Sequence, residues 1–133
     1  MDNAIEQMYQ ENILEHFKHP RNFGTLKNAS VEHHEKNPLC GDEIGMFLII
    51  DKGKKVTDVK FNGHGCAISQ ASASMLTEKI KGMNLKDAEK LTKEDVLEML
   101  GIELSAVRLK CALLSLDTLK NSIMIHEKYV VGK

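Results

Sequence analysis

The chain opens with apolar residues that recur at steps of three and four, a spacing typical of one face of an amphipathic helix. The residues with this spacing are Ile5, Met8, Tyr9, Ile13, Leu14 and Phe17. The His19-Pro20 step and Gly24 mark the end of the pattern, because proline disfavours helical geometry in the residue before it. We therefore predict an N-terminal helix, and we expect its apolar face to pack against a sheet.

The next part of the chain favours strands. Val31 to Glu35 is a weak candidate, whereas Ile44 to Ile50 is stronger, since it is rich in β-branched and aromatic residues and is followed by the turn-prone Asp51-Lys52-Gly53. After this turn, the segment 56–61 predicts the second arm of a hairpin. The links between these segments are short, which favours antiparallel pairing over crossover connections.

The hydrophobic period then changes to that of helices. The segment Ser69 to Lys81 predicts a helix that starts just after Cys66 and ends at Gly82. A further helix is predicted from Thr92, where Thr92 and Asp95 can form a capping pair, to a stop at Gly101.

The last predicted helix runs from about Cys111 to Ile125. Its expected inward-facing stripe consists of Leu113, Leu116, Leu119 and Ile123. With strands first and helices after, the pattern predicts one α+β domain over residues 1–133.

Composition narrows the function classes. A chain of 133 residues with 42% apolar content can bury a core without disulfides, so its three cysteines are available for other roles. Their odd number favours reduced thiols and a cytoplasmic location. The acidic N-terminal segment fits neither a signal nor a transit peptide, and no apolar run approaches the roughly 20 residues of a membrane span. A net charge of −1 and 5% aromatic residues do not favour nucleic-acid binding.

The candidate chemistry lies in Cys40, Cys66, Cys111 and the nearby Asp42. Three thiols and one carboxylate form a tetrahedral ligand set suited to zinc or to an iron–sulfur centre. Because these residues are distant in sequence, only the fold can bring them together. Taken singly, each cysteine fits a buried core position and Asp42 fits a solvated loop. Cys66 and Cys111 fall at or just before predicted helix N-termini, where backbone N–H groups and the helix dipole favour thiolates.

Other candidates carry weaker signals. The stretch Gly63-His64-Gly65 is poor evidence for phosphate binding and better explained as a tight turn that exposes Cys66. His33, His34 and His64 are chemically possible ligands, although His33 and His34 would point to opposite faces of a strand. The cations of Arg108 and Lys110 either favour a thiolate at Cys111 or pair with Asp42, or they form an ordinary exposed basic pair. The sequence leaves both alternatives open.

Four motifs together resemble one known family. They are MYQENILEHFKHPRNFG, NPLCGD, FNGHGCAISQASASMLTEKIKG and RLKCALLSLDTLK, in an order and at spacings similar to the NifU N-terminal, IscU and SufU family of iron–sulfur cluster assembly proteins. The resemblance covers about residues 5 to 125. It implies an α+β sandwich of SufE/NifU type, with a small three-stranded antiparallel sheet, helices packed on it and an N-terminal helix.

The resemblance also implies roles for the candidate residues. Cys40, Cys66 and Cys111 match the ligands of a transient [2Fe-2S] cluster or of zinc, and Asp42 matches the acid that keeps the cluster labile. Cys111 is the expected acceptor of persulfide sulfur, with Cys66 or Cys40 resolving it. The implied function is a scaffold that takes sulfur from a PLP-dependent cysteine desulfurase and iron from a donor, then passes the cluster to apo-proteins. The alternative is a zinc-dependent sulfurtransferase of the SufU type.

Two departures from the IscU pattern bear on these roles. IscU members carry a histidine immediately before the third cysteine, whereas this chain has Lys110 there. The Arg-x-Lys-Cys motif that results is similar to that of the SufU branch. The segment 104–108, Leu-Ser-Ala-Val-Arg, replaces the Leu-Pro-Pro-Val-Lys motif that a dedicated Hsp70 recognises, so Hsp70 binding is not expected. The chain between Cys66 and Cys111 is too short for the insertion typical of SufU. A monomer and a cluster-bridged oligomer both fit the sequence.

Overall fold

The computed structural model describes residues 3–38 and 41–131. Its sheet consists of β1 (Val31–Asn37), β2 (Asp42–Ile50) and β3 (Val56–His64), paired antiparallel in the order β1-β2-β3. The three predicted strands and their antiparallel pairing are therefore confirmed, and both β1 and β2 extend two residues further toward the loop between them than predicted. This extension makes Asp42 the first residue of β2.

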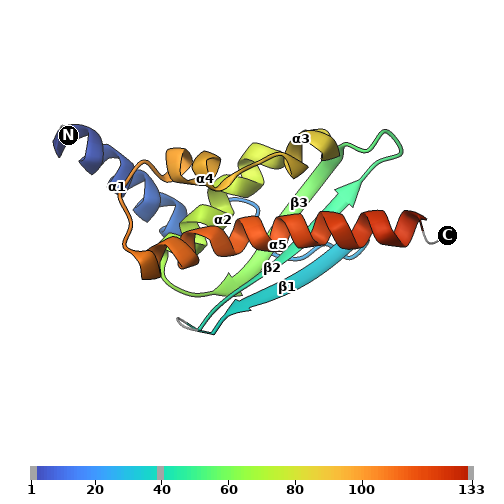
Figure 1. Ribbon diagram of the computed structural model, residues 1–133, viewed down its shortest axis with the longest axis horizontal. Coiled ribbons are helices and arrows are strands. Elements are labelled where there is room, and N and C mark those ends of the chain that lie inside the picture. Colours follow the sequence, from blue (N-terminus) through green and yellow to red (C-terminus); the bar gives the residue numbers. More distant parts are fainter. Residues whose placement is uncertain (1–2, 39–40, 132–133) are drawn as a thin grey trace.

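Five helices complete the described chain: α1 (Asn3–Lys18), α2 (Ala67–Ile80), α3 (Leu85–Glu89), α4 (Lys93–Leu100) and α5 (Ala106–Val131). Figure 1 shows α5 running over the sheet along most of the length of the molecule, with α2 beside it and α1 extending past the start of α5. The α+β fold with a three-stranded antiparallel sheet, helices packed on it and an N-terminal helix is confirmed.

The core lies between the sheet and the helices α2 and α5. Alternate residues of β2, including Ile44, Met46 and Leu48, are fully buried against the helices. The helices contribute a matching set of fully buried side chains, which includes Leu76 and Ile80 from α2 and Leu119 and Ile123 from α5. Each such side chain contributes about 1.5–3 kcal/mol by leaving water, so this layer supplies most of the stability.

Helix α1 packs mainly against α2, so the expectation that it packs on the sheet was wrong. Of its predicted apolar stripe, Ile13 is buried, whereas Leu14 and Phe17 are exposed. Tyr9 lies against Gly101, where a Cβ atom would be 2.2 Å from the ring. The helix was predicted correctly because its period is local, but its partner depends on the tertiary fold.

Helix α5 begins five residues earlier than predicted. The Ser105 Oγ accepts a hydrogen bond from the backbone N–H of Arg108 at 3.3 Å, the contact of an N-terminal cap. Cys111 is consequently the sixth residue of α5, and its backbone N–H lies beyond the unpaired donors of the first turn. The prediction that Cys111 lies at a helix N-terminus was wrong.

The connection between α2 and α5 contains two short helices. The predicted capping pair of Thr92 and Asp95 at the start of α4 is present, and Gly101 ends this helix in the left-handed conformation, with φ 70°. Helix α3 was not predicted. It is only 5 residues long and is capped by Asn84, whose side chain accepts from the N–H of Lys86. In residues 3–38 and 41–131, no helix has the length and apolarity needed to cross a membrane.

Candidate metal centre

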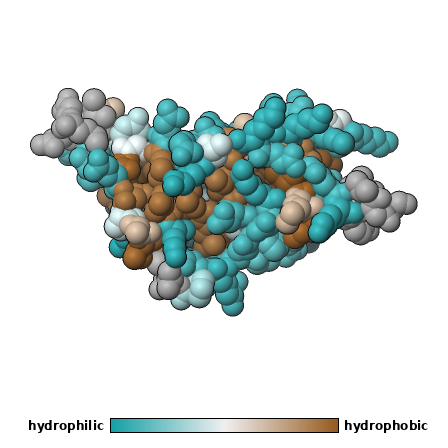
Figure 2. Space-filling view, in the orientation of Figure 1, coloured by the Kyte–Doolittle hydropathy of each residue, from teal (hydrophilic) through white to brown (hydrophobic). Residues whose placement is uncertain are grey.

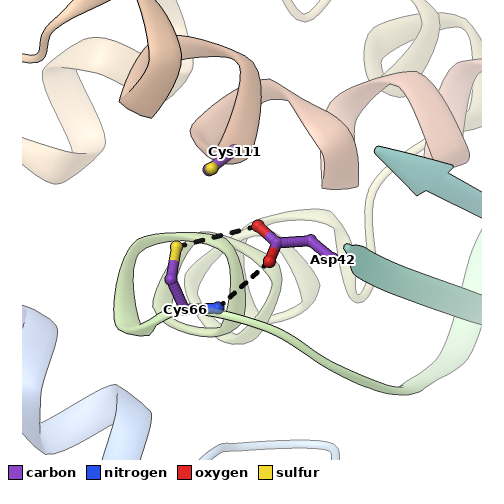
Figure 3. Close-up of side chains that lie close together, drawn as sticks. All are labelled: Asp42, Cys66 and Cys111. Carbon is purple, nitrogen blue, oxygen red and sulfur yellow. Dashed lines mark hydrogen bonds between the residues drawn. The ribbon is translucent and has the colours of Figure 1, made fainter. Parts of the chain in front are cut away.

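Asp42 is held at the end of the β1-β2 ladder, where it pairs with Asn37. Its side chain is only 2% exposed. The Oδ1 atom accepts a hydrogen bond from the backbone N–H of Cys66 at 3.3 Å. Burial and this hydrogen bond fix the carboxylate in one orientation, with the second oxygen, Oδ2, directed at the Cys66 side chain (Figure 3).

Cys66 is the N-cap residue of α2, as predicted. Its backbone is extended (φ −73°, ψ 168°) and its side chain makes no capping hydrogen bond to the helix. The thiol instead donates to Asp42 Oδ2, with 3.7 Å between sulfur and oxygen. A cysteine thus occupies a position where serine or aspartate would stabilise the helix better, so this position favours ligand chemistry over helix stability.

Two glycines form the turn between β3 and Cys66, as the sequence indicated. Gly63 has φ +134° and Gly65 has φ +157°, a region of backbone geometry that favours glycine. A Cβ atom on Gly65 would lie 2.7 Å from Cγ and Oδ1 of Asp42 and 2.6 Å from Oγ of Ser69. The backbone of Gly65 therefore lies directly beside the buried carboxylate, where no side chain fits.

Cys111 reaches the same point from α5 and is 1% exposed. One ligand atom from each of Asp42, Cys66 and Cys111 lies within 4.8 Å of the other two. In Figure 3 the three side chains converge from a strand, the loop before α2 and a helix. The structure therefore brings together three of the four candidate ligands, while Cys40 lies outside the described residues.

The donor atoms fit the groups that the sequence suggested. Two thiol sulfurs are soft ligands of the kind that zinc and iron–sulfur centres prefer, and the carboxylate oxygen is a harder one. Asp42 and Cys111 are buried and Cys66 is half-buried, so a metal bound here would be shielded from water on the inner side. Asp42, Cys66 and Cys111 would hold it.

The other sequence candidates do not join this group in the described part of the chain. His33 pairs with Glu35, His34 with Glu32 and His64 with Glu43, at 3.2, 3.1 and 3.4 Å respectively. Among the described residues, no ion pair connects Asp42 with Arg108 or Lys110. Each of the three histidines therefore pairs with a glutamate of the sheet and is not a ligand of the metal centre.

Two cavities lie near the centre, one lined by Cys66 itself and the other by Lys110, the residue before Cys111. One, of about 430 Å³, is lined by Cys66, Ala67, Ile68, Ile102, Glu103, Leu104, Ser105 and Arg108. Figure 2 shows apolar side chains gathered over the area where α1, α2 and the beginning of α5 lie. Sequence reasoning did not identify this cavity. The only available signal was the apolar pair Ile102 and Leu104 in a predicted loop.

The second cavity, of about 540 Å³, lies between β1 and α5, and both elements contribute charged residues to its lining. Its lining includes Lys110, Glu35 and Asp117. Burial, and secondarily the Glu35 charge, raises the pKa of Asp117 above its ordinary value. The Asn121 amide donates to Glu35 at 2.5 Å. Lys110 therefore lines this acidic cavity between β1 and α5.

The fold is a three-stranded antiparallel sheet covered by helices, and two thiols and a carboxylate converge on one point of it. Together these features define a small α+β domain that binds a metal or a cluster. Residues 8–131 match the NifU-like N terminal domain model. The chain belongs to the family of NifU-like N-terminal domains, which includes the IscU and SufU scaffold proteins.

Both branches of the family occur among its relatives. The chain is 35% identical to the zinc-dependent sulfurtransferase SufU of Bacillus subtilis, covering 92% of this chain and 94% of that protein. It is also 35% identical to the iron-sulfur cluster assembly scaffold protein IscU 1 of Archaeoglobus fulgidus, covering 88% and 75% of the two chains. The crystal structure of FiSufU from Fervidobacterium islandicum AW-1 superposes with a TM-score of 0.72 at 32% identity, covering 89% of this chain and 98% of that one.

Proposed function

We propose that this protein is a scaffold for iron–sulfur cluster assembly. It accepts sulfur from a PLP-dependent cysteine desulfurase and iron from a donor, holds a transient [2Fe-2S] cluster as its cargo, and passes the cluster to apo-proteins. The observation that carries this proposal is the convergence of Asp42, Cys66 and Cys111, whose ligand atoms lie within 4.8 Å of one another in a chain of this family. Cys40, two residues before Asp42, is the proposed fourth ligand.

The mixed donor set supports a carrier better than a permanent metal site. A carboxylate oxygen binds a soft cluster less firmly than a fourth thiolate would, so Asp42 favours release. A structural zinc site would gain affinity from a fourth thiolate and has no need of the acid. The position of Cys66 supports the same view, because its side chain gives up helix capping for ligand chemistry.

The proposed chemistry of this chain's residues starts with sulfur. Cys111 holds the sulfur as a persulfide, and reduction of that sulfur to sulfide takes two electrons. Ferrous iron and an external thiol or one-electron donor supply these electrons. Asp42 accepts hydrogen bonds from both the thiol and the backbone N–H of Cys66, and it thereby keeps the two sulfur ligands and the oxygen ligand in one place.

A second candidate function is a zinc-dependent sulfurtransferase. The observations that favour it are Lys110 in place of the IscU histidine and the similarity to the Bacillus subtilis SufU along nearly the full length of both chains. In this alternative the same residues hold zinc as a resident ion, and zinc supplies charge that keeps the thiols deprotonated. The sulfur would be relayed to another protein without assembly of a cluster.

Metal and sulfide analysis of the freshly isolated protein separates these functions first. The scaffold predicts bound or reconstitutable iron and sulfide in equal amounts, with a visible [2Fe-2S] spectrum after anaerobic incubation with iron, cysteine and a desulfurase. The sulfurtransferase predicts zinc alone, one ion per chain. Stoichiometric zinc that never gives way to a cluster would refute the scaffold.

The Asp42→Ala variant tests the proposed role of the acid in release. We expect its reconstituted cluster to persist longer than that of the wild-type protein, measured by the decay of the visible spectrum in the presence of an apo-ferredoxin. Asp58→Ala is the matched control, because Asp58 is a partly exposed acid paired with Lys81 and is not part of the metal-binding group. A cluster that decays equally fast in all three proteins would show that Asp42 does not control lability.

A further inference from the structure

The two edges of the sheet differ in what covers them. The edge formed by β3 is already paired. The N–H of Phe61 donates to the carbonyl of Asn22 at 2.9 Å, and the N–H of Val56 donates to the carbonyl of Met83 at 2.9 Å. In the described chain, β1 pairs with β2 alone, and Figure 1 shows its other side at the margin of the molecule, with no helix or strand beyond it. The edge formed by β1 is therefore open.

An open edge strand presents a row of unpaired backbone N–H and C=O groups, to which another extended strand can add. We propose that a second copy of this chain adds there, through antiparallel pairing of β1 with the partner's β1. The pairing joins two three-stranded sheets into one continuous sheet. It involves neither the metal centre nor the proposed function, so it stands independently of both.

Symmetry limits how the two copies of β1 can align. They pair about a two-fold axis, and one residue must face its own copy, because only alternate residues of an edge strand direct their backbone groups outward. In the 7-residue strand the central residue is His34, with His33 and Glu35 as the neighbouring choices. With the axis at His34, every residue of β1 lies opposite a residue of the partner's β1.

The charges of β1 favour the axis at His34. In this register, Glu32 lies opposite the partner's Lys36, and His33 lies opposite the partner's Glu35. Opposite charges that face each other across two strands stabilise the pairing, whereas like charges destabilise it. An axis at Glu35 would place this carboxylate opposite the partner's Glu35 and His34 opposite the partner's Lys36. An axis at His33 would place Lys36 beyond the end of the partner's β1. The charges thus select one register.

The single chain leaves the charges on the outer face of β1 incompletely paired. Glu32, His34 and Lys36 share this face and are exposed. Within the described chain, Glu32 pairs with His34 at 3.1 Å, and Lys36 has no ion pair. Glu43, the neighbour of Lys36 on β2, pairs with His64 at 3.4 Å. The partner's Glu32 would give Lys36 the ion pair that its own chain does not provide.

The helix layer leaves room for an added strand. Helix α5 packs over β1 on the inner face of the sheet, but the cavity of about 540 Å³ lies between them. Its lining includes Glu35 and Lys36 from β1 and Leu113 and Asp117 from α5. The inner side of the β1 edge is therefore not closed by α5 at this end, and the partner's strand can approach it.

The pairing keeps the two metal centres apart. Asp42 pairs with Asn37, which lies three residues from the axis at His34. The two copies of Asn37 are therefore six residues apart along the strands, or about 20 Å. One cluster cannot be shared across this interface, so the proposed dimer differs from a cluster-bridged oligomer.

Sedimentation velocity of the metal-free protein tests whether the dimer exists. A chelator and a reductant are present, so that neither a bound metal nor a disulfide can join the chains. We expect a shift from one chain to two chains as the protein concentration rises toward about 1 mM. A single chain over the whole range would overturn the proposal.

Charge reversal separates this interface from any other. Glu32→Lys and Lys36→Glu each place like charges opposite one another, and we expect each to weaken the dimer by at least about tenfold. Mixing the two variants should restore association, because a chain with two cations then faces a chain with two anions. Glu98→Lys is the matched control on the exposed side of α4 and should leave association unchanged. If mixing restored nothing, or if Glu98→Lys weakened the dimer equally, the proposal would be wrong.

Disulfide formation tests the register. His34→Cys places the two new thiols directly opposite each other, with Cα atoms about 5 Å apart, which is within the range of a disulfide. Lys36→Cys is the control, since its two copies would lie four residues apart along the strands. After mild oxidation, peptide mapping should find a link between the two substituted positions in His34→Cys and none in Lys36→Cys. Links through the three native cysteines are recognised by their own peptides. A missing link in the first variant, or a link in the second, would overturn the proposed pairing.

Discussion

The beginnings of α2 and α5 contribute one thiol each, yet they place these thiols in opposite settings. Helix α2 starts directly after Cys66, so this thiol stands at an open helix end beside a cavity. Helix α5 starts at Ala106, so Cys111 is more than one turn inside the helix and is buried. Similar sequence patterns, a cysteine followed by small and apolar residues, therefore produce an accessible ligand in one case and a covered one in the other.

The difference between the two settings comes from the residues before each cysteine. Gly63 and Gly65 turn the chain sharply in front of Cys66, and no helix can begin earlier there. Before Cys111 there is no glycine after Gly101, and Ser105 caps a helix that runs straight through the cysteine. The position of the Cys66 thiol thus depends on the backbone conformation of the preceding turn, whereas that of the Cys111 thiol depends on the packing of α5. Different substitutions should therefore disturb the two thiols.

The largest effect on stability and metal binding is expected from Gly65→Ala. This substitution changes the turn before α2 and leaves the surroundings of Cys111 in α5 unchanged. The new Cβ would lie 2.7 Å from the Asp42 carboxylate on a backbone with φ +157°. Strain and overpacking together should cost about 3 kcal/mol in the free energy of unfolding and abolish metal binding. Gly82→Ala is the matched control, since Gly82 has φ +86° but nothing within 4 Å of its Cβ position, and it should cost about 1 kcal/mol.

Urea unfolding and metal titration check this prediction. If Gly65→Ala lost no more stability than Gly82→Ala and still bound metal, the close contact between the Gly65 backbone and Asp42 would have no role in the centre.

The next prediction applies the same substitution at both cysteines, in metal-depleted protein. Cys66→Ser places a good capping residue at a helix start that lacks a side-chain cap, and should raise the free energy of unfolding by about 0.5–1 kcal/mol. Cys111→Ser places a hydroxyl in a buried position and should lower it by about 1–2 kcal/mol. Thermal or urea unfolding of both variants measures the difference. Changes of the same sign would contradict the contrast between the two settings.

A smaller effect concerns the face of α2 that contacts α1. His16 is buried, its Nδ1 lies 2.7 Å from Ser74 Oγ, and burial lowers the pKa of His16 below its ordinary value. The folded state therefore prefers the neutral ring and loses stability as the pH falls below about 6.5, the pKa of an unperturbed histidine. Ser74 accepts from the N–H of Arg21, so its own hydroxyl can donate to the neutral His16.

Unfolding measured between pH 7.5 and 5 checks this prediction. His16→Gln should flatten the pH dependence, whereas Glu15→Gln in the same helix leaves the ring in place and should retain the acid-dependent loss. An unchanged slope in His16→Gln would show that other groups cause the loss.

The smallest effect on stability is expected at Asp117, an exposed residue of α5 that lines the cavity between β1 and α5. The raised pKa of Asp117 means that its ionised form is disfavoured in the folded state, so it costs stability at neutral pH and this cost disappears as the carboxyl becomes protonated in acid. Asp117→Asn should therefore stabilise the protein by a few tenths of a kcal/mol at pH 7 and by nothing near pH 3, after allowance for solvent screening. Glu98→Gln on the exposed side of α4 is the control. Equal effects at both pH values would exclude this explanation.

The sequence was sufficient for features that depend on neighbouring residues. The strands, the capping box of Thr92 and Asp95, and the start of α2 follow from local patterns and were predicted correctly. The start of α5 was mispredicted because its cap, Ser105, lacks the acidic or amide residue three positions later that strengthens such a signal; Arg108 stands there. Helix α3 is too short for a hydrophobic period to reveal it.

The candidate site was predictable as a set of residue types but not as an arrangement. Nothing in the spacing of Asp42, Cys66 and Cys111 indicates that their ligand atoms meet, because they come from three elements that are brought together only by packing. The exposure of each thiol also depends on the tertiary fold. The cavity beside Cys66 arises where the segment after Gly101 passes the start of α2, and no local pattern encodes such an encounter.

The length of α5 determines where a label or a second protein can be attached without disturbing the metal centre. With a rise of about 1.5 Å per residue, Val131 lies roughly 30 Å along the helix axis from Cys111. Figure 1 shows this end of α5 at the opposite end of the molecule from α1 and from the start of α5. A fluorophore, a surface linker or a fused protein placed after Val131 would thus lie far from Cys111, whereas the same group on α1 would lie at the end of the molecule where α5 begins.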